Sequence, residues 1–243
     1  MGSTQYTGLL VNAAVSFIVF ISSWFLAIKV IKKKAYGKAR IPALAFSVVW
    51  LDIGLIYLSV AIRTIAAYFG LEQMDKMFFY ADNFFGAMLA GTIIFFTTYF
   101  LFKNKKVADS LAIIWVIAGF IWFYFDVKIG AQRVGVSYWL SEWKPGSEML
   151  MIAFGAMFYV PGLIALILLL LTSKKASSRT SKYKIVMTAL SLFIGATLMM
   201  IDLAGTKNPI AGLFVRVLIA FVTILGHLAY FPTKKIEEWL ERG

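Results

Sequence analysis

Cysteine is absent from the 243 residues, and histidine occurs only once, at His227. Without cysteine the chain has no disulfides, thiolate metal sites or cysteine nucleophiles. A single histidine excludes the bis-histidine haem and multi-histidine metal sites that membrane oxidoreductases and hydrolases often use. Paired DxxD aspartates for magnesium and a GxSxG nucleophile elbow are also missing. The sequence therefore predicts no metal site and no catalytic residues, and an enzyme is not the favoured class.

Charged residues are scarce, at 15% of the chain, whereas 61% is hydrophobic and 16% aromatic. This mixture is too apolar for one soluble core of this size. A helix needs about 20 apolar residues to cross the ~30 Å hydrocarbon layer of a membrane. The chain contains seven such segments, at about 8–31, 42–70, 77–102, 110–126, 148–172, 185–203 and 209–231. We predict an all-α integral membrane bundle of seven transmembrane helices over 1–231, followed by a short tail at 232–243.

Acidic residues are half as numerous as basic ones, 12 against 24, and the basic ones are unevenly placed. Every second connection and the tail together hold 17 lysines and arginines. The opposite connections hold five: Lys76, Lys128, Arg133, Lys144 and Lys207. Because cytoplasmic loops carry the excess of basic residues, we predict an outside N-terminus and a cytoplasmic C-terminus in the cell (plasma) membrane, with a composition that suits a prokaryote. The lipid bilayer accounts for these short basic runs, so nucleic acid is not an expected partner.

Two polar segments contain aromatic residues where membrane borders are expected. The longest outer connection, 127–147, is predicted to form an amphipathic cap or a short hairpin at the interface. An aromatic anchor is its simpler interpretation, and a ligand lid is the alternative. In the tail, Ile236, Trp239 and Leu240 recur at helical spacing and predict a short helix on the inner membrane surface. A docking site for a cytoplasmic partner is the alternative there.

Five charged residues lie within the predicted spans: Asp52, Arg63, Asp82, Asp202 and Arg216. Each costs ~2.5–3.5 kcal/mol in the middle of a membrane, so these residues are the first candidates for function. All except Asp52 fall in the outer half under the predicted orientation, and Asn83 follows Asp82 directly. We expect an acid and base network that opens outward, with Asp82 paired to Arg216 or to Arg63. Such a network can hold helices together, bind a small ligand or an ion, or conduct protons.

A second set of polar residues lies on shared helix faces. Asp52, Ser59 and Arg63 occur at i, i+7 and i+11, which places Asp52 near mid-membrane. His227 shares a face with Arg216 on the last span. We regard Asp52, Ser59 and His227 as a candidate proton or ion relay. Asp52 alone could serve as a general acid or base, but a single carboxylate does not make an enzyme the favoured class.

Small residues and a proline shape the predicted packing. Gly86, Ala87, Ala90 and Gly91 form small-xxx-small pairs that allow a neighbouring helix to approach closely. Pro161 is followed by a glycine near the middle of the fifth span. We expect a kink there that widens a central cavity.

Seven helices with an outside N-terminus is the arrangement of microbial rhodopsins and of many seven-helix receptors. Tyr80-Ala81-Asp82 resembles the segment of microbial rhodopsins in which an aspartate acts as the counterion of retinal. The Schiff-base lysine of that family is missing, because the seventh span offers only Arg216, which cannot replace it. The resemblance therefore implies an opsin-like protein without a retinal cofactor. The topology is also similar to the seven-helix sensing regions of some bacterial and archaeal signalling proteins.

The leading hypothesis is a membrane receptor or sensor that binds a small molecule, lipid or ion in an outward-facing polar cavity. The short cytoplasmic connections imply that its output passes to a cytoplasmic or membrane partner protein. An ion, proton or small-solute transporter or channel is the first alternative, with Asp52 in the relay. A structural subunit of a larger membrane complex is the second.

Overall fold

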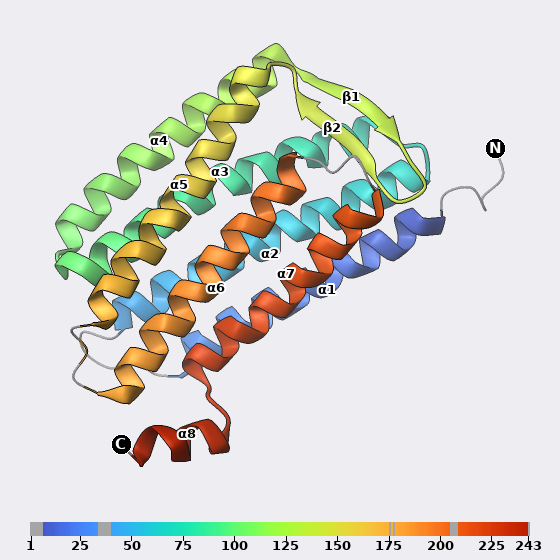
Figure 1. The fold of residues 1–243 in the computed structure, drawn as a ribbon. Helices are drawn as coiled ribbons and strands as arrows, with labels where there is room; N and C mark the ends of the chain where they lie inside the picture. Colours follow the sequence, from blue (N-terminus) through green and yellow to red (C-terminus); the bar gives the residue numbers. More distant parts are fainter. Residues whose placement is uncertain (1–6, 34–39, 175, 177, 205–208, 243) are drawn as a thin grey trace.

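Long helices dominate the computed structural model, which describes residues 7–33, 40–174, 176, 178–204 and 209–242 (Figure 1). The helices are α1 (Thr7–Lys32), α2 (Arg40–Tyr68), α3 (Glu72–Phe102), α4 (Lys105–Ile129), α5 (Glu148–Ser173), α6 (Arg179–Ala204), α7 (Pro209–Tyr230) and the short α8 (Lys234–Glu241). The first seven are long and apolar enough to cross a membrane. The prediction of a helical bundle with seven helices able to span a membrane is thus confirmed.

The helices extend beyond several of the predicted apolar segments, most clearly in α4, which covers 105–129 rather than 110–126. Its first turn is polar but is capped by Asn104, whose side-chain oxygen accepts from the backbone N–H groups of Lys106 and Val107 at 3.0 and 3.4 Å. Capping satisfies amide groups that would otherwise lack partners. The helix therefore begins at the cap and not where the hydrophobic run begins.

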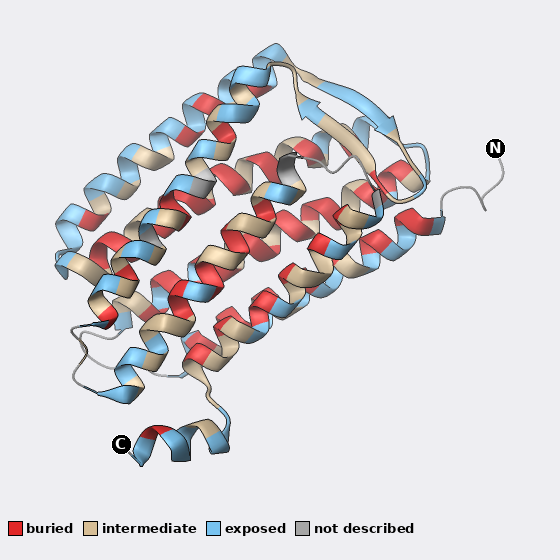
Figure 2. Cartoon of the chain, in the orientation of Figure 1, coloured by how far each residue is buried: buried red, intermediate tan, exposed pale blue. Residues whose placement is uncertain are grey.

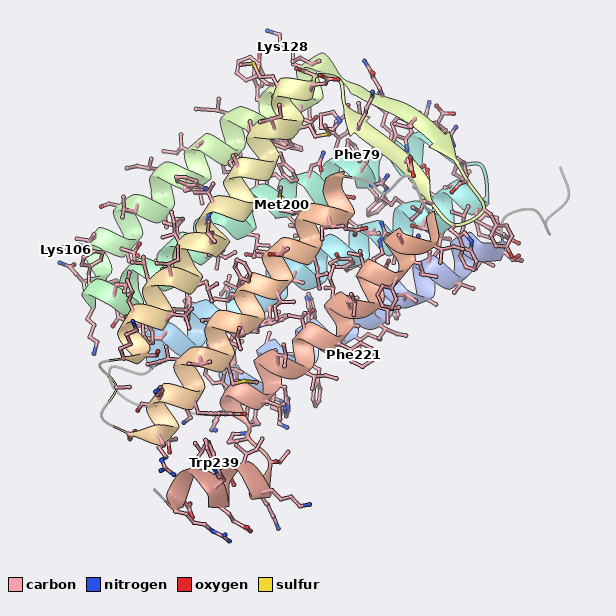
Figure 3. All side chains as sticks on the ribbon, viewed as in Figure 1. Phe79, Lys106, Lys128, Met200, Phe221 and Trp239 are labelled. Carbon is pink, nitrogen blue, oxygen red and sulfur yellow. The ribbon has the colours of Figure 1, made fainter. Side chains whose placement is uncertain are left out.

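The seven helices close into a bundle in which each packs on its neighbours in sequence, α7 returns to α1, and α3 also contacts α5. Burial is concentrated in α2 and α3, whereas α4 lies at the periphery and exposes most of its surface (Figure 2). Lys106 and Lys128 mark the two ends of α4 (Figure 3). The exposed isoleucines and phenylalanines between them suit a lipid environment, because hydrocarbon tails are as apolar as these side chains.

Close approach of α3 and α4 uses the small residues of α3. A methyl group on Gly91 would lie 2.6 Å from Cγ2 of Val116, and one on Gly119 would lie 3.2 Å from Cβ of Ala87. A larger side chain at either glycine would push the helices apart. This contact is the one that small-xxx-small spacing allows. Pro161 is buried within α5, which continues through it as a single helix.

A two-stranded antiparallel hairpin, β1 (Ala131–Val136) and β2 (Ser141–Pro145), joins α4 to α5. It is one of the two forms predicted for 127–147. The hairpin lies across the end of the bundle where α1 begins (Figure 1). Asn12 anchors it by donating from Nδ2 to the carbonyl of Trp139 at 2.7 Å. We call this the hairpin end and the opposite one the α8 end.

The predicted amphipathic tail is helical at α8, which contacts α6. Leu240 is buried, whereas Trp239 is 58% exposed and lies with its ring centroid 6.0 Å from the Arg179 guanidinium carbon. Trp239 lies on α8 (Figure 3), and its contact with Arg179 places its ring beside the first residue of α6. The apolar face of α8 is thus buried at Leu240 and exposed at Trp239.

Candidate functional site

The first polar cluster centres on Arg63 of α2, which lies between two aspartates of α3. Nη1 of Arg63 donates to Oδ2 of Asp82 at 2.9 Å, and Nε donates to Oδ1 of Asp75 at 3.4 Å. The guanidinium carbon also lies 5.1 Å from the ring centroid of Phe79. Only 11% of the Arg63 side chain is exposed, so its charge is balanced mainly by protein groups. Arg63 with Asp82 is one of the two pairings expected from the sequence.

Asp75 connects this cluster to the hairpin. Its Oδ2 accepts from Oγ of Ser141 at 2.5 Å and from Nε1 of Trp143 at 2.9 Å, and Nη2 of Arg63 donates to the Ser141 carbonyl at 3.1 Å. Asp75 was not selected from the sequence, because the third span was expected to begin at residue 77. The sequence could have identified Asp75, because it lies seven residues before Asp82 and so shares a helix face with it.

The second cluster centres on Arg216 of α7. Its Nε donates to both carboxylate oxygens of Asp202 at 3.1 Å, and Nη1 donates to Oδ1 of Asn12 at 2.8 Å. The hydroxyl of Tyr57 donates to Oδ2 of Asp202 at 3.3 Å. Arg216 is therefore paired with Asp202 rather than Asp82. Through Asn12, the cluster joins α6 and α7 to α1 and to the hairpin.

A cavity of about 370 Å³ at the hairpin end separates the two clusters. It is lined by α2, α3, α5, α6, α7 and the hairpin, and its charged members are Arg63, Asp82, Glu142, Lys144, Asp202 and Arg216. The structure therefore brings together the four charged residues predicted for the outer half. The volume of the cavity falls within the ~300–1,000 Å³ of typical small-molecule pockets.

Polar atoms at this cavity retain bonding capacity. Among the described residues, Oδ1 of Asp82 and Nη2 of Arg216 have no hydrogen-bond partner. A free carboxylate oxygen can accept from a cation or a hydroxyl, and a free guanidinium nitrogen can donate to an anion. The cavity thus presents one free acceptor and one free donor on opposite clusters.

A second cavity of about 420 Å³ adjoins the first and is predominantly apolar. The two share four lining residues, Phe79, Trp143, Met151 and Phe154, and the second continues to Ile152, Ala156 and Met200. Trp122 stacks on Phe154 with ring centroids 4.4 Å apart. Phe79 lies beside the hairpin and Met200 projects from α6 toward α5 (Figure 3). We call this cavity the apolar chamber.

Asn83, predicted as a member of the charged network, lies elsewhere. Its Nδ2 donates to Oδ2 of Asp126 on α4 at 3.0 Å, and its side chain lines the apolar chamber. Asp126 is fully buried and was not selected from the sequence, because it fell at the expected end of the fourth span. Since α4 continues to Ile129, Asp126 lies inside the helix and meets α3.

The three candidate relay residues are not brought together. Asp52 accepts from Oγ1 of Thr92 at 2.8 Å, and Ser59 donates to the backbone carbonyl four residues before it. At the α8 end, Nε2 of His227 lies 2.9 Å from Nζ of Lys29. Each residue has a separate local partner, so the relay stays a prediction.

Comparison with known proteins assigns no family. No family model matches the chain, and no curated protein matches its sequence. In the Tyr80-Ala81-Asp82 segment, the Tyr80 hydroxyl accepts from the backbone N–H of Ala131 at 2.8 Å, and Asp82 faces Arg63. The opsin-like resemblance rests on those three residues and on the topology.

Proposed function

We propose that the chain is a membrane receptor or sensor that binds a small molecule or lipid in the cavity at the hairpin end, opsin-like in arrangement but without retinal. The observation that carries this proposal is the cavity of about 370 Å³ that both the Arg63–Asp82 and the Arg216–Asp202 pairs line. Ion pairs that only fasten helices need no space beside them, because empty space forfeits packing contacts. Charged groups at membrane depth that face a shared cavity favour a binding role.

The proposed orientation places the hairpin end outside the cell and the α8 end in the cytoplasm. Supporting it, the described basic residues of the predicted inner connections lie at the α8 end, among them Lys29, Lys106 and Lys182. Under the positive-inside rule, that end faces the cytoplasm. The cavity would then receive its ligand from outside or from the outer leaflet of the plasma membrane. The signal would pass at the α8 end to a partner protein.

The orientation can be tested by cysteine labelling, since the chain has no cysteine of its own. We expect Gln132→Cys, on the exposed face of β1, to react with a membrane-impermeant maleimide on intact cells. Lys106→Cys, exposed at the α8 end, should react only after permeabilisation. The unaltered chain is the background control. The reverse pattern would contradict the proposed orientation.

The packing toward the α8 end favours a receptor over a channel. Beyond the polar cavity, the axis of the bundle is filled by buried side chains such as Val49, Trp50, Leu89 and Ile93, and the void beside them is only about 10 Å³. Water and ions need a polar route, which these residues do not provide. We expect vesicles reconstituted with the protein to show no ion or proton flux above protein-free vesicles. Flux abolished by Asp52→Asn would instead indicate the transporter alternative.

Binding itself can be tested by thermal unfolding of the purified protein across a library of charged, zwitterionic and neutral small molecules. A ligand at 100 times its Kd stabilises the folded state by about 2.7 kcal/mol. We expect a stabilising compound whose effect is lost in Asp82→Asn and in Arg216→Gln. Arg133→Gln, at an exposed ion pair with Glu72, is the control and should retain the effect. If no compound stabilises the protein and both cavity variants behave like the control, the binding proposal fails.

A further inference from the structure

The two adjoining cavities differ in chemistry, and together they describe one ligand. Resting on the proposed function, we propose that this ligand is a zwitterionic amphiphile with a single apolar chain. Its head lies between the Arg63 and Arg216 clusters, and its chain lies in the apolar chamber.

The charges of the polar cavity indicate a zwitterionic head. Three basic residues, Arg63, Lys144 and Arg216, and three acidic ones, Asp82, Glu142 and Asp202, line the cavity, and Asp75 pairs with Arg63 beside it. Charges of both signs are therefore available to a ligand. A zwitterion adds one charge of each sign, so it can pair with both and leaves the net charge of the site unchanged, whereas a ligand with a net charge would alter it.

The free atoms indicate how such a head would be held. Oδ1 of Asp82 is available to accept from an ammonium group, and Nη2 of Arg216 is available to donate to a phosphate or carboxylate. Hydrogen bonds between ionised groups are roughly twice as strong as neutral ones. Because the two atoms belong to different clusters, the head would span the cavity between α3 and α7.

The apolar chamber provides a place for the chain. Its polar side chains direct their N–H groups to protein acceptors, Asn83 to Asp126 and Trp143 to Asp75. The other lining residues are apolar or small. An amphiphile can place its head in a polar cavity inside the protein only if its chain remains in apolar surroundings. The shared lining of the two cavities meets this requirement.

The chamber also reaches the surface that faces lipid. Ile152 is 70% exposed, and Ala156, one turn further along α5, is exposed as well. The side chains shared by the two cavities include Met151, which is 38% exposed and has three rotatable side-chain bonds. We infer that a chain enters from the bilayer beside α5 by displacing a flexible side chain.

The test is a native mass spectrometry titration of the full chain in uncharged maltoside micelles. The probe is lysophosphatidylethanolamine with a 14-carbon chain, compared with glycerophosphoethanolamine, which is the same head without a chain, and with tetradecylamine and tetradecyl phosphate. We expect saturable binding of one lysophospholipid per protein. The three comparison compounds should bind at least about tenfold more weakly, as should the probe to Asp82→Asn or Arg216→Gln.

Substitutions in α5 test the role of the ligand's apolar chain separately from that of its head. Ala156→Phe places a ring in the apolar chamber, and Ile152→Trp is a second filling variant; both should weaken binding of the 14-carbon probe. Val160→Phe, equally on α5 and 41% exposed but lining neither cavity, is the matched control and should bind as the unaltered chain does. Thermal unfolding without probe verifies that each variant folds.

The possible failures are distinguishable. If glycerophosphoethanolamine binds as tightly as the lysophospholipid and both filling variants are neutral, the chain has no role and the amphiphile inference is overturned, while a small-molecule receptor survives. If tetradecylamine or tetradecyl phosphate binds best, the zwitterionic head is wrong. If neither these probes nor any library compound binds, the amphiphile inference and the proposed function fail together.

Discussion

Replacing Arg63 with glutamine is expected to lower the free energy of unfolding by roughly 3–5 kcal/mol, the cost of removing one partner from a buried ion pair. Arg63 balances Asp82 at 2.9 Å and Asp75 at 3.4 Å, and both aspartates are at most 5% exposed. Glutamine keeps a hydrogen-bonding side chain but removes the positive charge. Two buried carboxylates would then share one site without a counterion. Denaturation by sodium dodecyl sulfate in mixed micelles measures the change.

Arg133→Gln is the matched control for this experiment. Arg133 donates from Nη1 to Oε2 of Glu72 at 2.7 Å, a shorter contact than either made by Arg63. The two side chains are 29% and 58% exposed, so water screens the pair. Exposed pairs contribute about 0.2–1 kcal/mol. If Arg63→Gln costs no more than Arg133→Gln, the charge on Arg63 is not compensating buried acids.

A second variant separates charge from packing. Adding Asp82→Asn to Arg63→Gln removes one of the two uncompensated carboxylates and should recover part of the lost stability. Contacting residues typically show interaction energies of about 0.5–3 kcal/mol in such cycles. Strict additivity of the two changes would indicate that Arg63 acts through its packing against Phe79 rather than through its charge.

Hydropathy predicted the helices because twenty apolar residues in succession have no other means of satisfying their backbone in lipid. It could not predict where the helices end, because ends depend on individual caps. Asn104 extends α4 beyond its apolar run, and Lys103 closes α3 in a left-handed conformation with φ of 51°. The hairpin was predicted only as one of two forms, since residues distant in sequence, such as Asn12 and Tyr80, hold the paired strands against the bundle.

The candidate site was predicted in its charged members but not in its pairing. A charged side chain within a span has a high free energy in hydrocarbon, and this identifies four candidate site residues: Arg63, Asp82, Asp202 and Arg216. Which acid meets which base depends on the rotation of each helix about its axis, and the pattern of residues along one helix does not fix that rotation relative to its neighbours. Asn12 is not among the predicted site residues, because it carries no charge and, unlike Asn83, does not follow a charged residue in the sequence.

The Arg216 cluster gives an independent prediction, in which the acidic partner is replaced and not the arginine. Asp202→Asn is expected to destabilise the protein by roughly 3–5 kcal/mol, because Arg216, whose side chain is only 12% exposed, loses its counterion. Arg216 would keep its bond to Oδ1 of Asn12, and asparagine can still accept from Tyr57. The substitution therefore tests charge with little change in shape. Unfolding in mixed micelles with sodium dodecyl sulfate again provides the measurement.

Asp109→Asn provides the comparison for Asp202→Asn, since Asp109 also pairs with a base, Lys105, at 2.6 Å on the surface of α4. Its side chain is 39% exposed and that of Lys105 is 60% exposed, against 12% for both Asp202 and Arg216. An i,i+4 surface pair contributes only about 0.3–0.5 kcal/mol. Equal costs for the two aspartates would mean that water reaches Arg216 freely. The proposed cavity would then be an open vestibule, with no desolvated site in which a zwitterionic head could gain from the free guanidinium nitrogen.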